Sequence, residues 1–137
     1  MSSVARVWFR VTSALMCVVV AALFSACAVA PQGGLSEVMQ RPAERALLDG
    51  LRAYDDGLYA DAERELNKAL AAGLVSAKDR ASAHKYLAFV YCTSQRISPC
   101  EDAFRAARTA DFEFALTRAE AGHPVWGPVY KRVLAIP

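Results

Sequence analysis

The chain has 137 residues, 55% of them apolar, with 16 Lys and Arg side chains against 14 Asp and Glu. This length leaves room for one domain. The small positive charge, with its cations scattered singly along the chain, argues against a nucleic-acid-binding surface, because phosphate binding needs a basic surplus gathered on one face.

The first 26 residues have the three-part layout of a secretory signal peptide. Residues 1–10 carry two Arg and no acid, residues 11–24 are mostly apolar, and a pair of small residues precedes Cys27. This ending resembles the signal of bacterial lipoproteins, which implies that residues 1–26 are removed and that Cys27 becomes a lipid-bearing first residue. Its acyl chains would then hold the protein on a membrane.

Ala28, the residue after Cys27, implies by the same resemblance that the lipoprotein is exported to the outer membrane. Two alternatives stay open, namely cleavage without lipid after Ala28 or Ala30 and retention of the segment as a membrane anchor. Residues 27–41 are expected to hold the lipid and a flexible linker, since Pro, Gln and two Gly occur there without an apolar period. Residues 42–137 would then form the folded domain.

A pair of helices is predicted between Pro42 and Gly73. Pro42 suits the first turn of a helix that runs to about Asp55, and Gly57 ends it. The second helix has its apolar residues on one face at a 3.6-residue period, at Ala62, Leu66, Ala69 and Leu70. Gly73 then ends this helix.

This predicted pair resembles a tetratricopeptide repeat, a helical hairpin of about 34 residues. With Ala43 at repeat position 1, the small residues Gly50 and Ala62 fall where helices of the repeat approach closely. A second copy begins near Ala81, offset by 38 residues. The resemblance implies an all-α fold, with two such hairpins and a C-terminal capping helix.

Seven apolar or aromatic residues in a row, Tyr86–Cys92, stand out in the predicted domain. The run is too short to cross a membrane, which takes about 20 apolar residues. By itself it also fits a buried strand, but the preceding residues 77–85 are mostly good helix formers without Gly or Pro. We therefore expect one long helix, buried between the first hairpin and its own partner helix.

Cys92 and Cys100 fall at repeat positions 12 and 20, on either side of a turn near Arg96. Antiparallel helices would bring the two thiols side by side, and the oxidising periplasm favours a disulfide between them. Two alternatives remain: free thiols, with Cys100 in the place of a small buried residue, and a metal site that includes His84. The metal site lacks a fourth ligand at a suitable spacing.

The C-terminal residues predict a cap on the open end of the repeats. Thr117 and Glu120 have the spacing of a capping box that starts a short helix, and Pro128 suits the first turn of a last helix. The apolar residues expected to cover the repeats are Trp126, Val129, Tyr130, Val133 and Leu134. In the alternative, Trp126 or His123 contributes to a partner site.

Three parts of the chain together resemble a proteobacterial family of small tetratricopeptide lipoproteins associated with type VI secretion, of the TssQ type. They are His84–Cys92, the pair Cys100 and Phe104, and Ala119–Tyr130, of which the last is the most distinctive. The resemblance implies an accessory envelope protein of a contractile injection machine, without catalytic activity and with a membrane-complex component as its partner. Together with the lipoprotein signal, it implies a domain at the outer membrane that faces the periplasm.

The residues themselves also argue against an enzyme. The sequence has no nucleophile beside a general base in a recognisable elbow, no Gly-rich phosphate loop and no His pair at metal spacing. Asp55 with Asp56, and Glu63 with Glu65, fit solvated surface charges better than a catalytic carboxylate pair. No cofactor and no metal ion are therefore expected.

Partner binding is expected on the face lined by the first helix of each repeat. There Leu51, Tyr54 and Phe89 would be apolar anchors and Lys85 a polar handle for an extended or helical peptide. In the alternative, the same residues are only core. Two other functions fit the sequence as well: a pilotin-like lipoprotein that assists a secretin or pilus component, and a structural spacer of the cell envelope.

Overall fold

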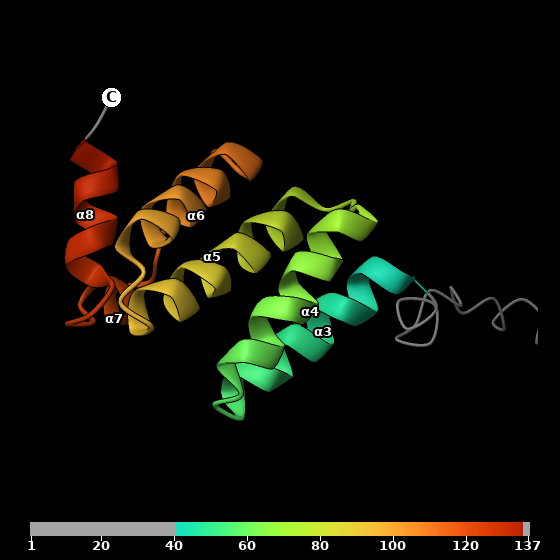
Figure 1. Cartoon of the computed structure of the whole chain (residues 1–137). Helices are drawn as coiled ribbons and strands as arrows, with labels where there is room; N and C mark the ends of the chain where they lie inside the picture. The colour runs from blue at the N-terminus through green and yellow to red at the C-terminus, as the bar shows by residue number, and fades with distance from the viewer. Residues whose placement is uncertain (1–40, 136–137) are drawn as a thin grey trace, which may run out of the picture. The chain divides into compact units, whose positions relative to one another are not determined.

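Helices form the regular structure of residues 41–135, the part of the chain that the computed structural model describes (Figure 1). In chain order they are α3 (Pro42–Asp55), α4 (Tyr59–Ala72), α5 (Ala77–Thr93), α6 (Ile97–Ala110), α7 (Arg118–Ala121) and α8 (Gly127–Ala135). The prediction of an all-α fold with two helical hairpins and a C-terminal cap is confirmed. Cys27 and the expected signal peptide lie outside the described residues, as does the expected linker except for Arg41.

The two hairpins keep the same register at an offset of 38 residues. Both first helices end at repeat position 13, and both second helices begin at position 17 and contain 14 residues. Between them, position 15 has a positive φ in both copies, 74° at Gly57 and 60° at Gln95. The same turn geometry therefore recurs, although only the first copy has the glycine that this conformation favours.

The residues that lengthen the offset extend the start of α5 and the connection before it. This helix has 17 residues where α3 has 14, and its additional residues lie at the N-terminus. Ser76 caps the extension by accepting a hydrogen bond from the backbone N–H of Asp79. The Arg80 guanidinium donates to the carbonyl oxygens of Leu74 and Val75, at 2.9 and 2.8 Å. These bonds fix the connection between the hairpins.

Equivalent positions of the two hairpins form the core. Position 20 is Ala62 or Cys100, position 24 is Leu66 or Phe104, and position 27 is Ala69 or Ala107, and all six side chains are 0% exposed. In the first hairpin the helices approach so closely that a Cβ on Gly50 would lie 2.8 Å from Cγ of Leu66. Gly50 and the small residues at positions 20 and 27 therefore allow the helices to pack side by side.

The apolar run Tyr86–Cys92 lies within α5, as predicted, and not in a strand. Five of its seven side chains are buried, and the two tyrosines are half-buried. The helix packs against α6 as its hairpin partner and against both α3 and α4 of the preceding hairpin. Neighbours on opposite sides explain why this helix is apolar around most of its circumference.

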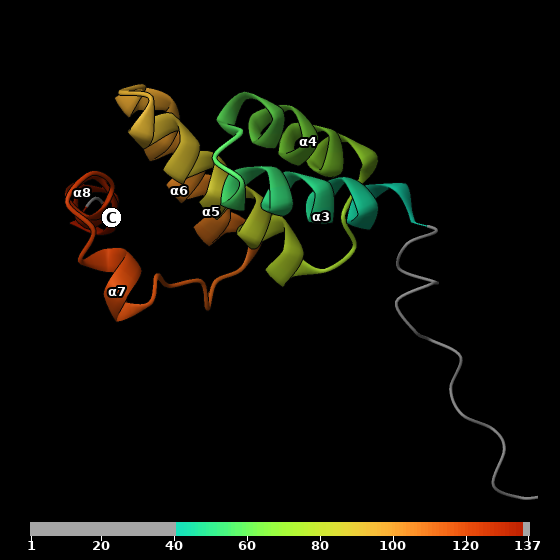
Figure 2. The ribbon, with the colours of Figure 1, turned by 90° about the horizontal axis from the view of Figure 1, so that it is seen from below.

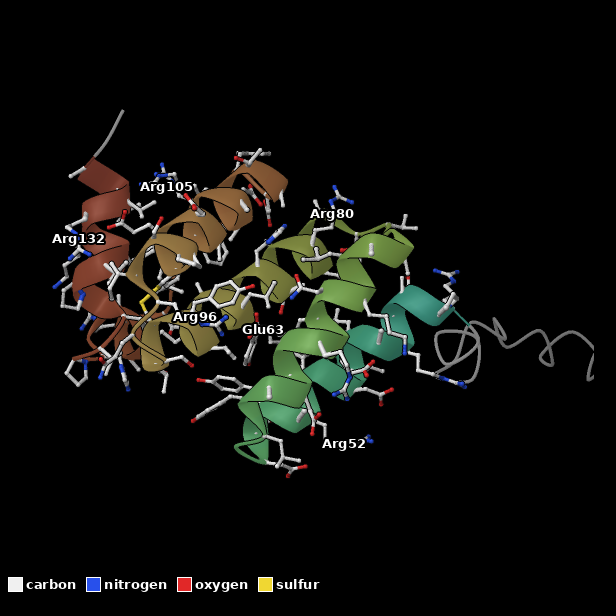
Figure 3. All side chains as sticks on the ribbon, in the orientation of Figure 1. Arg52, Glu63, Arg80, Arg96, Arg105 and Arg132 are labelled. Carbon is white, nitrogen blue, oxygen red and sulfur yellow. A yellow bond between two sulfur atoms is a disulfide. The ribbon has the colours of Figure 1, made fainter. Side chains whose placement is uncertain are left out.

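A disulfide joins α5 to α6 through Cys92 and Cys100, whose Cα atoms are 5.3 Å apart (Figure 3). The two residues are 1% and 0% exposed. Position 12 of α5 and position 20 of α6 face each other across the antiparallel pair. The bond therefore crosses the hairpin interior rather than its surface.

An ion pair connects the two hairpins. Arg96, just before α6, donates to both carboxylate oxygens of Glu63 on α4, and the two side chains point toward one another in Figure 3. The Arg96 guanidinium also lies 4.5 Å from the ring centroid of Tyr91. The bond from Arg96 holds the pKa of Glu63 below its ordinary value of 4.5, against the opposing effect of burial.

The cap is formed by α8, which packs on α6. Val129, Tyr130 and Val133 are buried there, and Arg132 donates to Glu101 across the two helices. The predicted role of Leu134 is wrong: its side chain is 47% exposed, because it lies at the edge of the face of α8 that Val129, Tyr130 and Val133 bury against the repeats.

The capping box at the start of α7 is confirmed. The Thr117 hydroxyl accepts from the backbone of Glu120, and the Glu120 carboxylate accepts from the backbone of Thr117. In Figure 2 the connection between α6 and α7 runs on the side of the domain away from α4. None of the helices between residues 41 and 135 is both long and apolar enough to cross a lipid bilayer.

Candidate partner-binding face

Six aromatic rings form a continuous row across the domain, which we call the aromatic strip. In spatial order its members are Tyr59, Tyr54, Tyr86, Phe89, Trp126 and His123. Successive ring centroids are separated by 5.6, 4.9, 5.7, 4.3 and 3.3 Å. The row begins in the first hairpin, crosses α5 and ends between α7 and α8.

Local structure explains how these residues meet. Tyr86 and Phe89 are three residues apart on α5 and therefore share one face of that helix. Tyr54 lies in the last turn of α3, and Tyr59 begins α4, so the short turn between the two helices brings both rings together. Trp126 is held in place because its indole N–H donates to the carbonyl oxygen of Glu120 at 2.9 Å.

The structure distributes the four predicted partner-binding residues differently. Leu51, Tyr54 and Lys85 are half-buried and retain accessible surface. Phe89 is only 3% exposed, because Trp126 stacks on its ring with an interplanar angle of 23°. Phe89 is therefore a core residue in this structure and does not present a surface anchor, as expected in the alternative interpretation of the sequence.

Lys85 is tied to the C-terminal segment. Its ammonium donates to the Glu120 carboxylate at 2.7 Å and lies 4.9 Å from the ring centroid of Tyr86 and 5.7 Å from that of Phe89. Burial by itself would raise the pKa of Glu120, but hydrogen bonds from Lys85 and Thr117 outweigh it, and the pKa is lowered. The carboxylate is therefore charged and the pair is an ion pair at neutral pH.

An open cleft of about 270 Å³ lies beside this ion pair. Its walls include Lys78, Ser82 and Lys85 from α5 and Phe114, Thr117 and Glu120 from the following segment. The predicted binding face of the second hairpin is thus partly covered by the chain's own C-terminal region. What remains open is this polar cleft and the part of the aromatic strip formed by Tyr59, Tyr54 and Tyr86, which we call the tyrosine end.

At the tyrosine end, the surroundings of Tyr54 disfavour ionisation of its phenol. Burial raises the pKa of its phenol to about 12, and nearby Tyr59, Tyr86, Asp55 and Glu120 act in the same direction. The phenol is therefore neutral at physiological pH, and its hydroxyl can donate a hydrogen bond. Its ring meets the ring of Tyr86 edge-on, at an interplanar angle of 80°.

A metal centre finds no support in residues 41–135, where no three His, Cys, Asp or Glu side chains gather to hold an ion. His84, the predicted third ligand beside the cysteines, is half-buried in α5, and burial lowers its pKa. Both cysteine sulfurs are used in the disulfide.

Sequence reasoning named Trp126 and His123 as alternative partner-site residues, but it missed the contribution of Glu120 to this face and the packing of Trp126 on Phe89. The sequence pattern explains Glu120 as a capping-box residue, and it does fill that role, but its carboxylate also reaches Lys85, 35 residues away. The one signal in the chain was the His-Pro-Val-Trp segment, since a Trp beside turn residues needs an apolar neighbour elsewhere in the fold. The chain pattern does not say that this neighbour is Phe89.

Searches of protein-family models, curated proteins and solved structures found no significant match to this chain.

Proposed function

We propose that this protein is a non-catalytic, lipid-anchored adaptor of the outer membrane, which holds an envelope protein on the tyrosine end of its aromatic strip. The observation that carries the proposal is the exposure of that end after the fold has packed. Tyr59 is 39% exposed, and Leu51, Tyr54 and Tyr86 are half-buried. Rigid, partly exposed aromatic side chains of this kind are enriched at the energetic centres of protein interfaces.

The anchor and its compartment rest on the sequence. The signal layout before Cys27 supports lipidation of that residue, and the Pro- and Gly-containing residues 28–41 supply reach between membrane and domain. A disulfide between Cys92 and Cys100 suits an oxidising compartment. The domain would therefore face the periplasm.

The machine that the adaptor serves is proposed from the resemblance of His84–Cys92 and Ala119–Tyr130 to type VI secretion lipoproteins. In the structure these two stretches contact each other, through the Lys85–Glu120 ion pair and the Phe89–Trp126 stack. The two stretches that carry the resemblance therefore pack together in the fold, and the first of them includes Tyr86, at the tyrosine end of the strip. On this basis we propose a membrane-complex component of the type VI apparatus as the partner.

In-cell crosslinking of the full-length protein, followed by mass spectrometry of the captured proteins, tests the proposal. We expect recovery of membrane proteins of the injection machine, with a loss in a Cys27→Ser variant that cannot be lipidated. Recovery of a secretin or pilus subunit would replace the proposal with the pilotin function. Recovery of abundant envelope proteins alone would favour the structural spacer.

A matched pair of variants connects the capture to the aromatic strip. Tyr59→Ala removes a 39% exposed ring from the strip, while Ile97→Ala removes a side chain of similar exposure, 43%, at the start of α6. We expect Tyr59→Ala to reduce capture of the partner and Ile97→Ala to leave it unchanged, with both variants folded by circular dichroism. Equal capture by the two variants would show that the partner binds elsewhere.

A further inference from the structure

The middle of the aromatic strip already binds a cation. Lys85 holds its ammonium 4.9 Å from the ring centroid of Tyr86 and 5.7 Å from that of Phe89, and the Glu120 carboxylate lies 2.7 Å away. Two ring faces and one carboxylate thus surround one cationic side chain. This is the combination of cation–π attraction and ion pairing that proteins use to hold Lys and Arg.

Two tyrosine rings and an exposed carboxylate also occur at the tyrosine end of the strip. The rings of Tyr54 and Tyr59 lie 5.6 Å apart, and Asp55, the last residue of α3, adds an exposed carboxylate. Among the described residues, Asp55 has no ion-pair partner, and no Lys or Arg lies over either ring. Arg52, in the last turn of α3, and Arg64, on α4, pair with other aspartates, Asp49 and Asp61.

The local electrostatics favour a positive charge at this end. Asp55 and Asp56 both lie at the C-terminus of α3, where the aligned peptide dipoles give the helix end a partial negative charge, and Arg52 is the one basic residue of the last turn. The first hairpin, residues 41–73, carries five Lys and Arg against seven Asp and Glu. The raised pKa of the Tyr54 phenol has burial as its main cause and the neighbouring Asp55 and Glu120 as additional ones.

We propose that Tyr54, Tyr59 and Asp55 form a recognition site for a cationic side chain, foremost arginine, on an exposed segment of the partner protein. The proposal rests on the proposed adaptor function and adds the chemistry by which the partner is chosen. The planar guanidinium can stack on one tyrosine ring while its N–H groups donate to the carboxylate, so arginine is expected to bind better than lysine.

Synthetic peptides test the site on the full-length protein in detergent. The probes are labelled Gly-Ser peptides that each contain two copies of arginine, lysine, citrulline or glutamate, and binding is measured by fluorescence anisotropy at low salt. Citrulline keeps the shape of arginine without its charge. We expect the arginine peptide to bind about tenfold more tightly than the citrulline peptide, and the glutamate peptide to bind least.

Variants locate the binding. Asp55→Asn and Tyr59→Ala are expected to reduce the affinity for the arginine peptide severalfold, whereas Asp102→Asn, an equal charge change at an exposed position of α6, should leave it unchanged. Equal affinity for the arginine and citrulline peptides would overturn the proposal. So would an Asp55→Asn variant that binds the arginine peptide as well as Asp102→Asn does.

The outcomes for the site and for the adaptor function can be separated. If Asp55→Asn captures the injection-machine proteins as well as the unmodified protein does, the cationic site is wrong while the adaptor function stands. If the arginine peptide binds through Asp55 but crosslinking in cells recovers no protein of the machine, the site stands and the proposed function is wrong.

Discussion

Removal of the Cys92–Cys100 disulfide should cost a large part of the stability of this domain. The two residues are separated by 8 positions, so the bond closes a short loop that contains the α5–α6 turn. In the chain-entropy account, a cross-link of this length raises the free energy of the unfolded state by about 2.5 kcal/mol. For a domain of this size, that corresponds to a fall in Tm of about 10–20 °C on reduction.

Urea unfolding with and without reductant measures this contribution. Both sulfurs are buried, at 1% and 0% residue exposure, so the protein is reduced while unfolded and then refolded in reductant, with free thiols counted to show that the bond is broken. A Cys92→Ala/Cys100→Ala variant is the control, because it has no bond to lose and should unfold identically in both buffers.

The difference in the free energy of unfolding between oxidised and reduced protein, obtained from the urea midpoint and the denaturant slope, tests the reasoning directly. We expect this difference to be about 2.5 kcal/mol, with little change in the slope, since so short a loop hardly alters the surface exposed on unfolding. A difference under about 1 kcal/mol, with all thiols free, would refute the loop-entropy account. In that case α5 and α6 would be held together by packing alone.

Three further predictions concern the turn, the cap and the ion pair between hairpins. Gln95→Gly should stabilise the domain by about 0.5–1 kcal/mol and Gly57→Gln should destabilise it by a similar amount, because both positions have positive φ, which glycine adopts most easily. Urea midpoints of the two variants check this, and a shift of the same sign in both would contradict it. Trp126→Ala should cost about 2–3 kcal/mol and expose Phe89, seen as increased binding of a hydrophobic dye; an unchanged Tm and dye signal would show that the stack is not needed. Because the folded-state pKa of Glu63 is lowered, its pairing with Arg96 stabilises the fold above the ordinary pKa of 4.5, and this stabilisation is lost as the pH falls through the folded-state pKa. A Glu63→Gln variant should therefore lose less Tm in acid than the unmodified protein, and identical profiles of Tm against pH would contradict this.

Much of the fold was predictable because the relevant signals are local. Pro42, Gly57 and Gly73 mark helix ends through backbone preferences that act over a few residues. The 38-residue recurrence of small residues then gives the hairpin architecture, because two helices can approach closely only where side chains are small. The capping box of α7 was equally visible, since its two partners are three residues apart.

The binding face was less predictable because it depends on contacts between residues distant in the chain. The repeat pattern put Phe89 and Lys85 on an open face, but it carries no information about how the C-terminal segment packs. That segment returns to the face, where Trp126 covers Phe89 and Glu120 pairs with Lys85. Whether a repeat face stays open therefore depends on the packing of the chain's last residues.

The sequence by itself thus determined the helices, the two hairpins and the position of the cysteines, since propensity, period and turn residues act within a few positions of the chain. Only the tertiary structure decided which aromatic rings remain accessible. Burial of a side chain is the sum of all its neighbours, and those of Tyr54 come from α4 and α5 as well as from its own helix. The accessible tyrosine end of the strip results from that packing.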